Sequence, residues 1–496
     1  MSWKKDLKKA YREEYDAQRD DGLLSKHLGI ATSDKPKKYH DVPKIAFRVA
    51  LTSILLFVVG GPIGIYLSLR LQVRQNQVSL KKTYDGARLQ SLREATVRAL
   101  NHIEYADRDF QKKEVSEEAE RAINSFAASL HAQMDEEATY VYSPLSAYLH
   151  LDVLSLGATS NVKEDLLAAL GSDALRDQAI PNAIATNFYT GEKGSAHVYQ
   201  GAFFQQNATL VEGYVDKLTS RRVEAYSLDM DKDLSAIPSW ANGKIGENML
   251  TEKDLEYVSG ETLAYWFSLL EFQGKWSTSY SDAKTTDKTF TRLDGSARKM
   301  PFMNHEVPFV GKTIDPRARC GIYDYGDYIS AYDYYQNGYT IQYLTPKEKG
   351  KNIFSLLQGK DIFVEDEEKS LAVELEKSRT YTVSFVVPKF KASFFVDLTP
   401  RIKKMGLSSL YEDLQHSIAG AVELSPNGGA VAFTKQCNSI EFSETGTVAR
   451  SITFSGGYGA SSAYRGENYV ITLDEPFLYV IRDPNGLPMF VGAYNG

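Results

Sequence analysis

The sequence contains few of the groups on which enzymes and metal sites depend. Only two cysteines occur, Cys320 and Cys437, and their separation matches neither a zinc-binding nor a redox spacing. The eight histidines are scattered, and none forms the H-E-x-x-H spacing of a zinc hydrolase. No G-x-S-x-G sequence is present to hold a catalytic serine on a sharp turn. We therefore expect that the chain is not an enzyme and that it binds no metal or other cofactor.

An excess of positive charge is also missing. The formal net charge is -7 at pH 7, which argues against general nucleic-acid binding. Gly456, Gly457 and Gly459 resemble a phosphate-binding loop, but the Gly-Lys-Ser/Thr sequence that such a loop requires does not follow them. We interpret this stretch as a flexible loop.

One long apolar run stands out near the N-terminus. Residues 49–69 contain no charged side chain and lie between Arg48 and Arg70. At a rise of ~1.5 Å per residue, about 21 helical residues span the hydrocarbon core of a bilayer. A buried core helix is the alternative, but no neighbouring segment would cover it. The sequence therefore predicts a single transmembrane helix over residues 49–69.

The segments beside this run differ in character. Residues 1–48 are polar and charged, which predicts a short solvated helix or a disordered tail, with a membrane-surface helix as the alternative. Basic residues occur on both sides of the run, so the positive-inside rule does not decide the orientation. We expect a cytoplasmic tail and a single-pass protein of the cell membrane whose large C-terminal domain is extracellular. A domain that faces the cell interior is the alternative.

Residues 70–115 are predicted to be a helical stalk or linker. Their apolar residues recur at three- to five-residue steps among polar neighbours: Leu89, Leu92, Val97, Leu100 and Ile103. This pattern fits either a free stalk or a helix packed on the following domain.

A large domain is predicted for residues 116–496. Helical patterns dominate its first part, and strand-like alternation dominates from about Thr262 onward, as in residues 381–390 and 469–481. Helical and strand regions that are segregated in this way indicate an α+β fold rather than alternating βαβ units.

Five segments of this domain resemble the serpin family, in the family's order and spacing. They are Val141–Leu170, Leu269–Tyr280, Thr291–Asn304, Val383–Asp413 and Asp474–Gly496. The second segment holds the Phe-x-Gly-Lys-Trp motif of serpins, and the last is similar to their C-terminal hairpin. The resemblance covers residues 116–496 and implies a serpin fold, with three β-sheets, several helices and an exposed reactive-centre loop.

The resemblance also implies roles for individual residues. Those of the shutter, beneath the opening of the central sheet, are Ser143, Pro144 and Ser146, and Trp276 lies at the breach, where the loop first enters. The hinge of the loop is Glu444, Gly446, Thr447 and Ala449. Three positions depart from the family. Gln436 replaces the shutter histidine, Ser268 replaces an asparagine, and Ala449 alone remains of several hinge alanines.

The loop after the hinge has a pattern of its own. A loop that becomes a central strand must turn alternate side chains into the core. The inward positions are all small: Thr447, Ala449, Ser451, Thr453, Ser455, Gly457 and Gly459. Their outward neighbours are mostly large: Val448, Arg450, Ile452, Phe454 and Tyr458. No proline interrupts the run, so the loop is predicted to be competent for insertion.

The family resemblance implies a suicide-substrate inhibitor of extracellular serine proteases, although some serpins inhibit cysteine proteases. Counting from Glu444 predicts cleavage between Ala460 and Ser461, by a protease with a small-residue pocket. Counting back from Pro476 favours Arg465 and Gly466 and a trypsin-like protease. The alternative function is a non-inhibitory binding or structural module at the membrane. The physiological target is left open.

Overall fold

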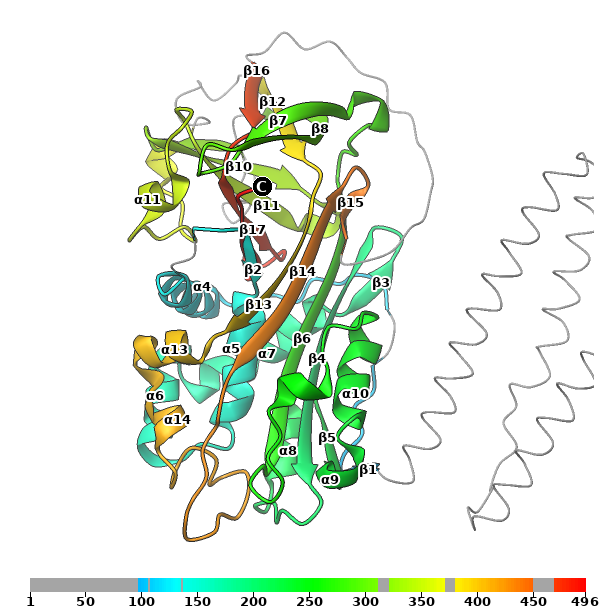
Figure 1. Cartoon of the computed structure of the whole chain (residues 1–496), viewed down its shortest axis with the longest axis vertical. Helices are drawn as coiled ribbons and strands as arrows, with labels where there is room; N and C mark the ends of the chain where they lie inside the picture. Colours follow the sequence, from blue (N-terminus) through cyan, green and yellow to red (C-terminus); the bar gives the residue numbers. More distant parts are fainter. Residues whose placement is uncertain (1–96, 106–107, 135–136, 311–320, 371–379, 449–467) are drawn as a thin grey trace, which may run out of the picture. The chain divides into compact units, whose positions relative to one another are not determined.

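Three β-sheets organise the part of the chain that a computed structural model describes (Figure 1). The described residues are 97–105, 108–134, 137–310, 321–370, 380–448 and 468–496. Within them, the main sheet has the strand order β1-β5-β4-β6-β15-β14-β13, with β3 paired to β4. Its strands are β1 (Val97–Ala99), β3 (Tyr189–Gly191), β4 (Gly194–Gln205), β5 (Val223–Leu228), β6 (Ala264–Lys275), β13 (Lys391–Asp397), β14 (Lys435–Ser443) and β15 (Gly446–Val448).

The two smaller sheets lie beside the end of the main sheet at which β15 is found (Figure 1). The second sheet has the order β2-β18-β17-β11-β10-β9. Its strands are β2 (Tyr140–Tyr142), β9 (Ile322–Asp324), β10 (Tyr328–Tyr334), β11 (Thr340–Pro346), β17 (Phe477–Arg482) and β18 (Pro488–Tyr494). The third sheet has the order β16-β12-β8-β7. Its strands are β7 (Thr286–Thr291), β8 (Ala297–Val310), β12 (Thr380–Pro388) and β16 (Asn468–Thr472).

Helices lie on both faces of the main sheet, and α11 (Ile353–Leu357) packs on β11 of the second sheet. They are α4 (Glu117–His131), α5 (Pro144–Ser155), α6 (Ser160–Leu170), α7 (Asp173–Thr186), α8 (Tyr214–Ser220), α9 (Met230–Asp233), α10 (Ala236–Ile245), α11 (Ile353–Leu357), α13 (Thr399–Ile402) and α14 (Ser409–Glu412). Neighbouring residues of β6 point to opposite faces. Ser268 meets Ser146 of α5, whereas the ring of Phe267 meets Trp240 of α10. The main sheet is therefore sandwiched between α5 and α10.

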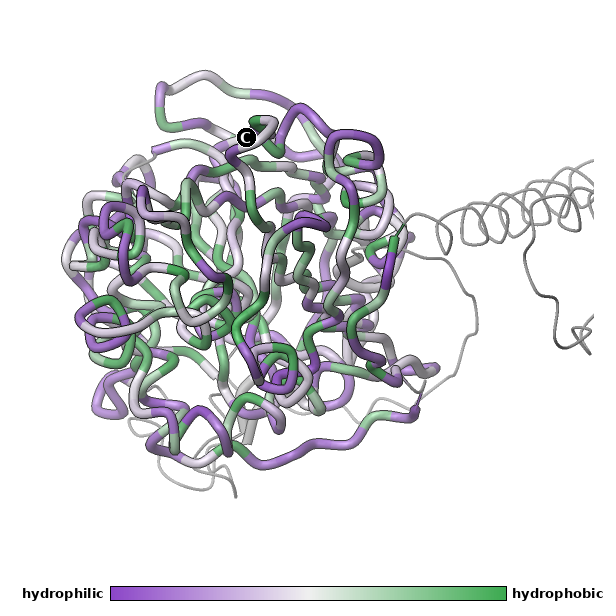
Figure 2. Tube along the Cα trace, turned by 90° about the horizontal axis from the view of Figure 1, so that it is seen from below, coloured by the Kyte–Doolittle hydropathy of each residue, from purple (hydrophilic) through white to green (hydrophobic). Residues whose placement is uncertain are grey.

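Local sequence explains where α5 begins. Ser143 is its N-cap, and the Ser143 hydroxyl accepts a hydrogen bond from the backbone N–H of Ser146. Pro144 follows in the first turn, where its missing N–H is not needed. Almost every residue of α5 is buried, so this helix is the centre of the core. Figure 2 shows the apolar segments mostly inside the domain and the hydrophilic ones at its edge.

The described residues confirm the predicted α+β fold with three sheets. The predicted strand over residues 381–390 corresponds to β12, and the predicted strand over 469–481 is divided between β16 and β17. The division falls near Pro476, which cannot donate a ladder hydrogen bond.

The helix predicted up to residue 115 is wrong for residues 97–115. Val97–Ala99 is a strand that pairs with β5, and the rest of this described stretch contains no helix. Asn101 extends the pairing, because its side chain accepts from the Ala225 N–H and donates to the Val223 carbonyl. Pairing with an available sheet edge overrides a helical pattern. The packed domain therefore begins before the predicted boundary at residue 116.

The predicted tail (1–48) and transmembrane helix (49–69) lie outside the described residues, as do residues 70–96 of the predicted stalk. Among the residues that are described, no helix combines the length and the hydrophobicity that a membrane span requires.

Candidate functional site at the opening of the main sheet

A short strand enters the main sheet between β6 and β14. Strand β15 pairs antiparallel with both neighbours, and Thr447 lies opposite Gly274 on β6 and Phe442 on β14. Beyond Val448, no described strand occupies the space between β6 and β14, which otherwise pair only with strands on their outer sides. The sheet is therefore divided along most of the length of these two strands (Figure 1).

Aromatic side chains surround the entrance to this opening. The hydroxyl oxygens of Thr447 and Tyr335 lie 2.5 Å apart, and both residues are buried. The ring of Tyr335 stacks on Trp276 with 4.4 Å between the ring centroids. The indole Nε1 of Trp276 donates a 2.9 Å hydrogen bond to the carbonyl of Ser443, at the end of β14. These contacts fix the end of β14 and the start of β15 against the same pair of aromatic side chains.

Glu444 lies in the turn between β14 and β15 and is fixed by two donors. Its carboxylate accepts from Lys389 Nζ at 2.8 Å and from Thr285 Oγ1 at 3.0 Å. Burial opposes the negative charge, but the hydrogen bonds, with that from Lys389 foremost, outweigh this effect and hold the pKa of Glu444 below its ordinary value. The carboxylate is therefore ionised at neutral pH and anchors the turn.

Two glycines allow the strands to approach at the entrance. A Cβ atom on Gly446 would lie 2.0 Å from the carbonyl oxygen of Gly274, a distance at which backbone would have to move. A Cβ atom on Gly274 would in turn collide with the rings of Phe272 and Tyr335. Glycine is required at both positions for β15 to lie in the sheet as it does.

The start of α5 joins both sides of the opening. Gln436 of β14 binds the backbone of Ser143 twice, accepting from its N–H at 3.0 Å and donating to its carbonyl at 2.9 Å. The Ser143 hydroxyl donates to the carbonyl of Met489 on β18 at 2.6 Å. On the other side, the Ser146 hydroxyl donates to the Ser268 carbonyl on β6 at 3.0 Å. The Ser268 hydroxyl is buried and has no partner among the described residues.

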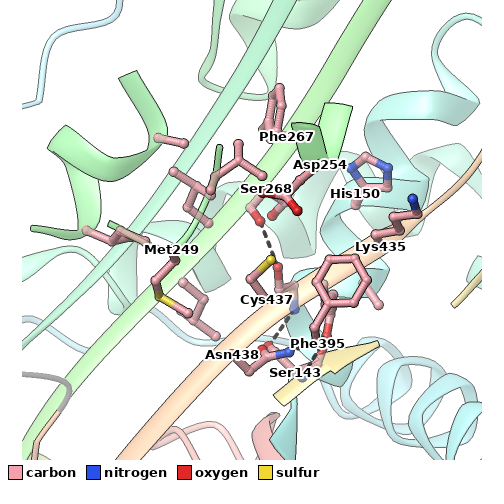
Figure 3. A pocket seen from close by; sticks show the side chains of 18 of the residues that line it. Ser143, His150, Met249, Asp254, Phe267, Ser268, Phe395, Lys435, Cys437 and Asn438 are labelled. Atoms are coloured by element: carbon pink, nitrogen blue, oxygen red, sulfur yellow. Dashed lines mark hydrogen bonds between the residues drawn. The ribbon is translucent and has the colours of Figure 1, made fainter. Parts of the chain in front are cut away.

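A cavity of about 180 Å³ continues the path of β15 between β6 and β14. Figure 3 shows that Ser268 from β6, Cys437 and Asn438 from β14, and Met249 from the segment after α10 contribute to its lining. His150 of α5 lines it as well. The cavity is therefore formed by the two separated strands and by the elements on both faces of the sheet.

Burial shifts the pKa values of two titratable groups in the cavity. Burial raises the pKa of the Cys437 thiol to about 11, so the nucleophilic thiolate is scarce at neutral pH. Burial lowers the pKa of His150 to about 4, so its imidazole is neutral there. Both groups are therefore mainly in their neutral forms at neutral pH.

The structure brings most of the sequence-predicted residues to this opening. Trp276, Glu444, Gly446 and Thr447 meet at its entrance, and Ser143, Pro144 and Ser146 lie beneath it. Thr447, assigned to the inward face by the alternation of the loop, is only 2 % exposed. Ala449 and the residues of both candidate cleavage bonds, Ala460, Ser461, Arg465 and Gly466, lie outside the described residues.

Sequence analysis missed two residues of the entrance. Tyr335 reaches Thr447 across 112 positions of the chain, and no local pattern marks such a contact. Lys389 lies in the Pro-Lys-Phe part of a segment with family resemblance, but its pairing with Glu444 depends on how β13 pairs with β14. In both cases the partner is decided by tertiary packing.

Comparison of the sequence with known proteins identifies a single family. A family model described as "Serpin (serine protease inhibitor)" matches residues 121–495. Serpin-Z2A of Triticum aestivum is 24 % identical over 368 residues, which cover 71 % of this chain and 88 % of the relative. Serpin-ZXA of Oryza sativa subsp. japonica is 25 % identical over 405 residues, which cover 74 % of this chain and 94 % of the relative.

Solved structures show the same fold. The thermophilic serpin Tengpin in its native state covers 80 % of this chain and 100 % of its own length, with a TM-score of 0.63 and 18 % identity. The cleaved Serpin 42Da covers 77 % of this chain and 99 % of its own length, with a TM-score of 0.60 and 18 % identity.

Proposed function

Because the chain belongs to the serpin family, we propose that it is a suicide-substrate inhibitor of extracellular serine proteases. A protease attacks the reactive loop, about residues 446–466, and becomes linked to it as an acyl-enzyme. The cleaved loop then enters the main sheet as a new central strand and carries the protease with it. Strain stored in the native fold drives this step. The chain supplies no catalytic residue, because the nucleophile belongs to the protease.

The partly inserted strand β15 is the observation that carries the proposal. It pairs with both β6 and β14 over Gly446–Val448, and a cavity lies between the same two strands beyond these pairs. The backbone groups of β6 and β14 that face this cavity are available to a further length of strand. Each new backbone hydrogen bond contributes about 0.5–1.5 kcal/mol net, so a longer insertion stabilises the sheet.

The register of β15 supports the loop as the strand that fills the opening. Thr447 pairs with Gly274 and Phe442, so six residues further along the loop Thr453 comes opposite Ser268 and Gln436. The Ser268 hydroxyl lacks a hydrogen-bond partner among the described residues. In the inserted form, the Thr453 hydroxyl would become its partner. Leaving a buried polar group without a partner costs about 1–3 kcal/mol, and insertion removes this cost.

The same register also gives Arg450, the charged residue near the start of the loop, an acidic partner. Arg450 lies three residues beyond Thr447 and comes opposite Glu271 on β6 and Ser439 on β14. Arg450 belongs to the outward-facing set, and Glu271 reaches His197 on the neighbouring strand at 3.1 Å. An Arg450–Glu271 ion pair would therefore form on the outer face of the inserted sheet.

The proposed cleavage site is the bond between Ala460 and Ser461, with Arg465–Gly466 as the second choice. The first bond fits a protease with a small-residue pocket, and the second fits a trypsin-like enzyme. The proposal also includes one transmembrane helix at residues 49–69, with the domain outside the cell. Support for this part comes from the uncharged run itself.

The test uses the full-length chain in a mild detergent, mixed with elastase-, subtilisin- and trypsin-like proteases. We expect a covalent complex that survives SDS, and a released peptide that begins at Ser461 or, for the second choice, at Gly466. The cleaved chain should also melt at a higher temperature than the intact chain. Cleavage without a complex and without a higher melting temperature would favour the non-inhibitory binding module instead.

The proposed membrane orientation of the C-terminal domain is tested in a separate experiment. Protease added to intact cells that express the full-length chain should digest the C-terminal domain if it is extracellular. Protection of the domain until the cells are permeabilised would overturn the proposed orientation.

A further inference from the structure

The first described strand shows from which end of the main sheet the N-terminal part of the chain enters the domain. Val97 of β1 lies opposite Leu228, the last residue of β5, and the two strands are antiparallel. Strand β5 runs parallel to β4, and Phe204 near the end of β4 lies opposite Ala264, the first residue of β6. The chain therefore enters β1 from the end of the sheet at which β6 begins.

The reactive loop starts at the other end of the main sheet. Gly446 of β15 lies opposite Lys275, the last residue of β6, and Val448 lies opposite Gln273. Strand β6 has 12 residues, so at ~3.3 Å per residue its two ends are about 40 Å apart. Figure 1 shows β15 and β1 at opposite ends of the sheet. The loop therefore leaves the sheet far from the end at which the chain enters β1.

Insertion of the cleaved loop would bring it to the row of paired residues that contains β1. In the continued register of β15, Gly457 comes opposite Ala264. From Ala264 the row continues through Phe204 and Ser227 to Arg98 of β1. A strand inserted as far as Gly457 thus reaches the end of the sheet from which the chain enters β1.

Both candidate cleavage sites lie beyond this row. Ala460 and Arg465 follow Gly457 in the sequence, and neither has a position on β6 left to pair with. A protease that remains linked to either residue would therefore move along the whole length of β6 and past its first residue. It would finish beside the place at which residues 70–96 join β1.

A membrane anchor would make space at this end of the sheet important. The proposed transmembrane helix covers residues 49–69, so residues 70–96 alone connect it to β1. A protease domain of about 250 residues has a radius of gyration of about 18 Å, which corresponds to a diameter of about 45 Å. A connection of 27 residues reaches about 40 Å as a helix and about 90 Å when fully extended. This range includes the width of a protease, whereas seven residues reach only about 23 Å.

We propose that residues 70–96 are a spacer whose length admits the trapped protease between the main sheet and the membrane. The inference rests on the proposed inhibitory function and on the proposed transmembrane helix. It adds that the length of the spacer, rather than its sequence, determines how efficiently an anchored chain traps a protease. Attack on the loop is independent of the spacer, because it takes place at the opposite end of the sheet.

The test compares the full-length chain with a variant that lacks residues 72–91 and keeps seven residues between the helix and β1. Both are reconstituted in phosphatidylcholine vesicles with the domain outside, and each is mixed with a protease that the wild-type chain traps in detergent. We expect the same rate constant for cleavage of the loop. The number of chains cleaved for each protease trapped should rise at least about fivefold in the shortened variant, the change that about 1 kcal/mol makes in a partition between two outcomes.

Two controls separate the length of the spacer from other effects of the deletion. Replacing residues 72–91 with the same number of glycine and serine residues preserves a long connection and should restore the wild-type yield of covalent complex in vesicles. In mild detergent, where no extended bilayer faces the protease, the shortened variant should trap as efficiently as the wild type. A loss that persists in detergent, or that the glycine-serine segment does not repair, would overturn the spacer.

The remaining outcomes distinguish the spacer from the proposed function. If the shortened variant traps as well as the wild type in vesicles, the spacer is wrong and the inhibitory function stands. The spacer is also wrong if the wild-type chain traps in detergent but not in vesicles, or does not insert into vesicles at all. If the wild-type chain forms no covalent complex in detergent, the proposed function is wrong and the spacer is withdrawn with it.

Discussion

Thr447 of β15 shares a buried hydrogen bond with Tyr335, the residue that follows β10 of the second sheet. The two hydroxyl groups satisfy each other in a place that water does not reach, and the Tyr335 ring continues the contact to Trp276. The point at which the loop enters the main sheet is thus tied to a different sheet.

A first prediction follows from the burial of Thr447. Thr447→Arg would bury a positive charge beside Tyr335, and an unpaired buried charge costs several kcal/mol. We expect T447R to remain folded with its loop expelled from the sheet, and to be cleaved by the target protease without forming a covalent complex. Val448→Arg, at the adjacent outward position, should still form the complex. Gels of both reactions check this, and a T447R complex as abundant as that of the wild type would contradict it.

A second prediction concerns the inserted form alone. Arg450→Glu would place a carboxylate opposite Glu271 in the continued register of β15. We expect a lower melting temperature for cleaved R450E than for the cleaved wild type, while the intact proteins melt alike. Adding Glu271→Lys should restore the melting temperature of the cleaved form. An equal effect on the intact and cleaved forms would show that Arg450 does not reach this position.

Comparison of sequence and structure shows which features depend on local patterns. The start of α5 could be predicted because Ser143 and Pro144 carry the capping and first-turn signals in adjacent positions. Strand β12 could be predicted because its apolar run is long and strongly β-favouring. Features of this kind need little knowledge of distant parts of the chain.

Features that depend on distant partners could not be predicted in the same way. Val97 lies in a helical pattern but forms a strand, because β5 offers an unpaired edge. The bond between Lys435 and Glu256 joins residues 179 positions apart, and the sequence of either neighbourhood suggests only a solvated charge. The family resemblance singled out Ser143 and Trp276, but their hydrogen-bond partners, Gln436 and the Ser443 carbonyl, are decided by tertiary packing.

A third prediction concerns acid stability and follows from His150 in the cavity. Burial lowers its pKa from 6.5 to about 4 in the folded state, so between these values the unfolded chain binds more protons. Stability is therefore fully present above pH 6.5 and is lost as the pH falls toward 4, by up to about 3 kcal/mol for this one group. Removing the histidine should remove that loss.

The measurement is urea unfolding of the full-length chain at several pH values between 4 and 7.5. His150→Gln should lose less stability over this interval than the wild type. Asp483 acts in the opposite direction, because burial raises its pKa to about 6 and its contribution to stability falls as the pH rises through that value. Identical pH dependence in H150Q and the wild type would contradict the prediction.

The last prediction concerns the buried charge network behind the main sheet. Asp152 of α5 forms ion pairs with two arginines, Arg176 of α7 and Arg221 after α8, and its side chain is 1 % exposed. Asp152→Asn would leave both guanidinium groups short of negative charge in a buried place, and breaking such a pair costs about 3–5 kcal/mol. We expect D152N to unfold at a markedly lower urea concentration. Asp177→Asn, which removes an exposed carboxylate from the same Arg221, should cost much less because Asp152 still neutralises the arginine. Equal losses in the two variants would mean that burial of Asp152 does not determine the strength of the network.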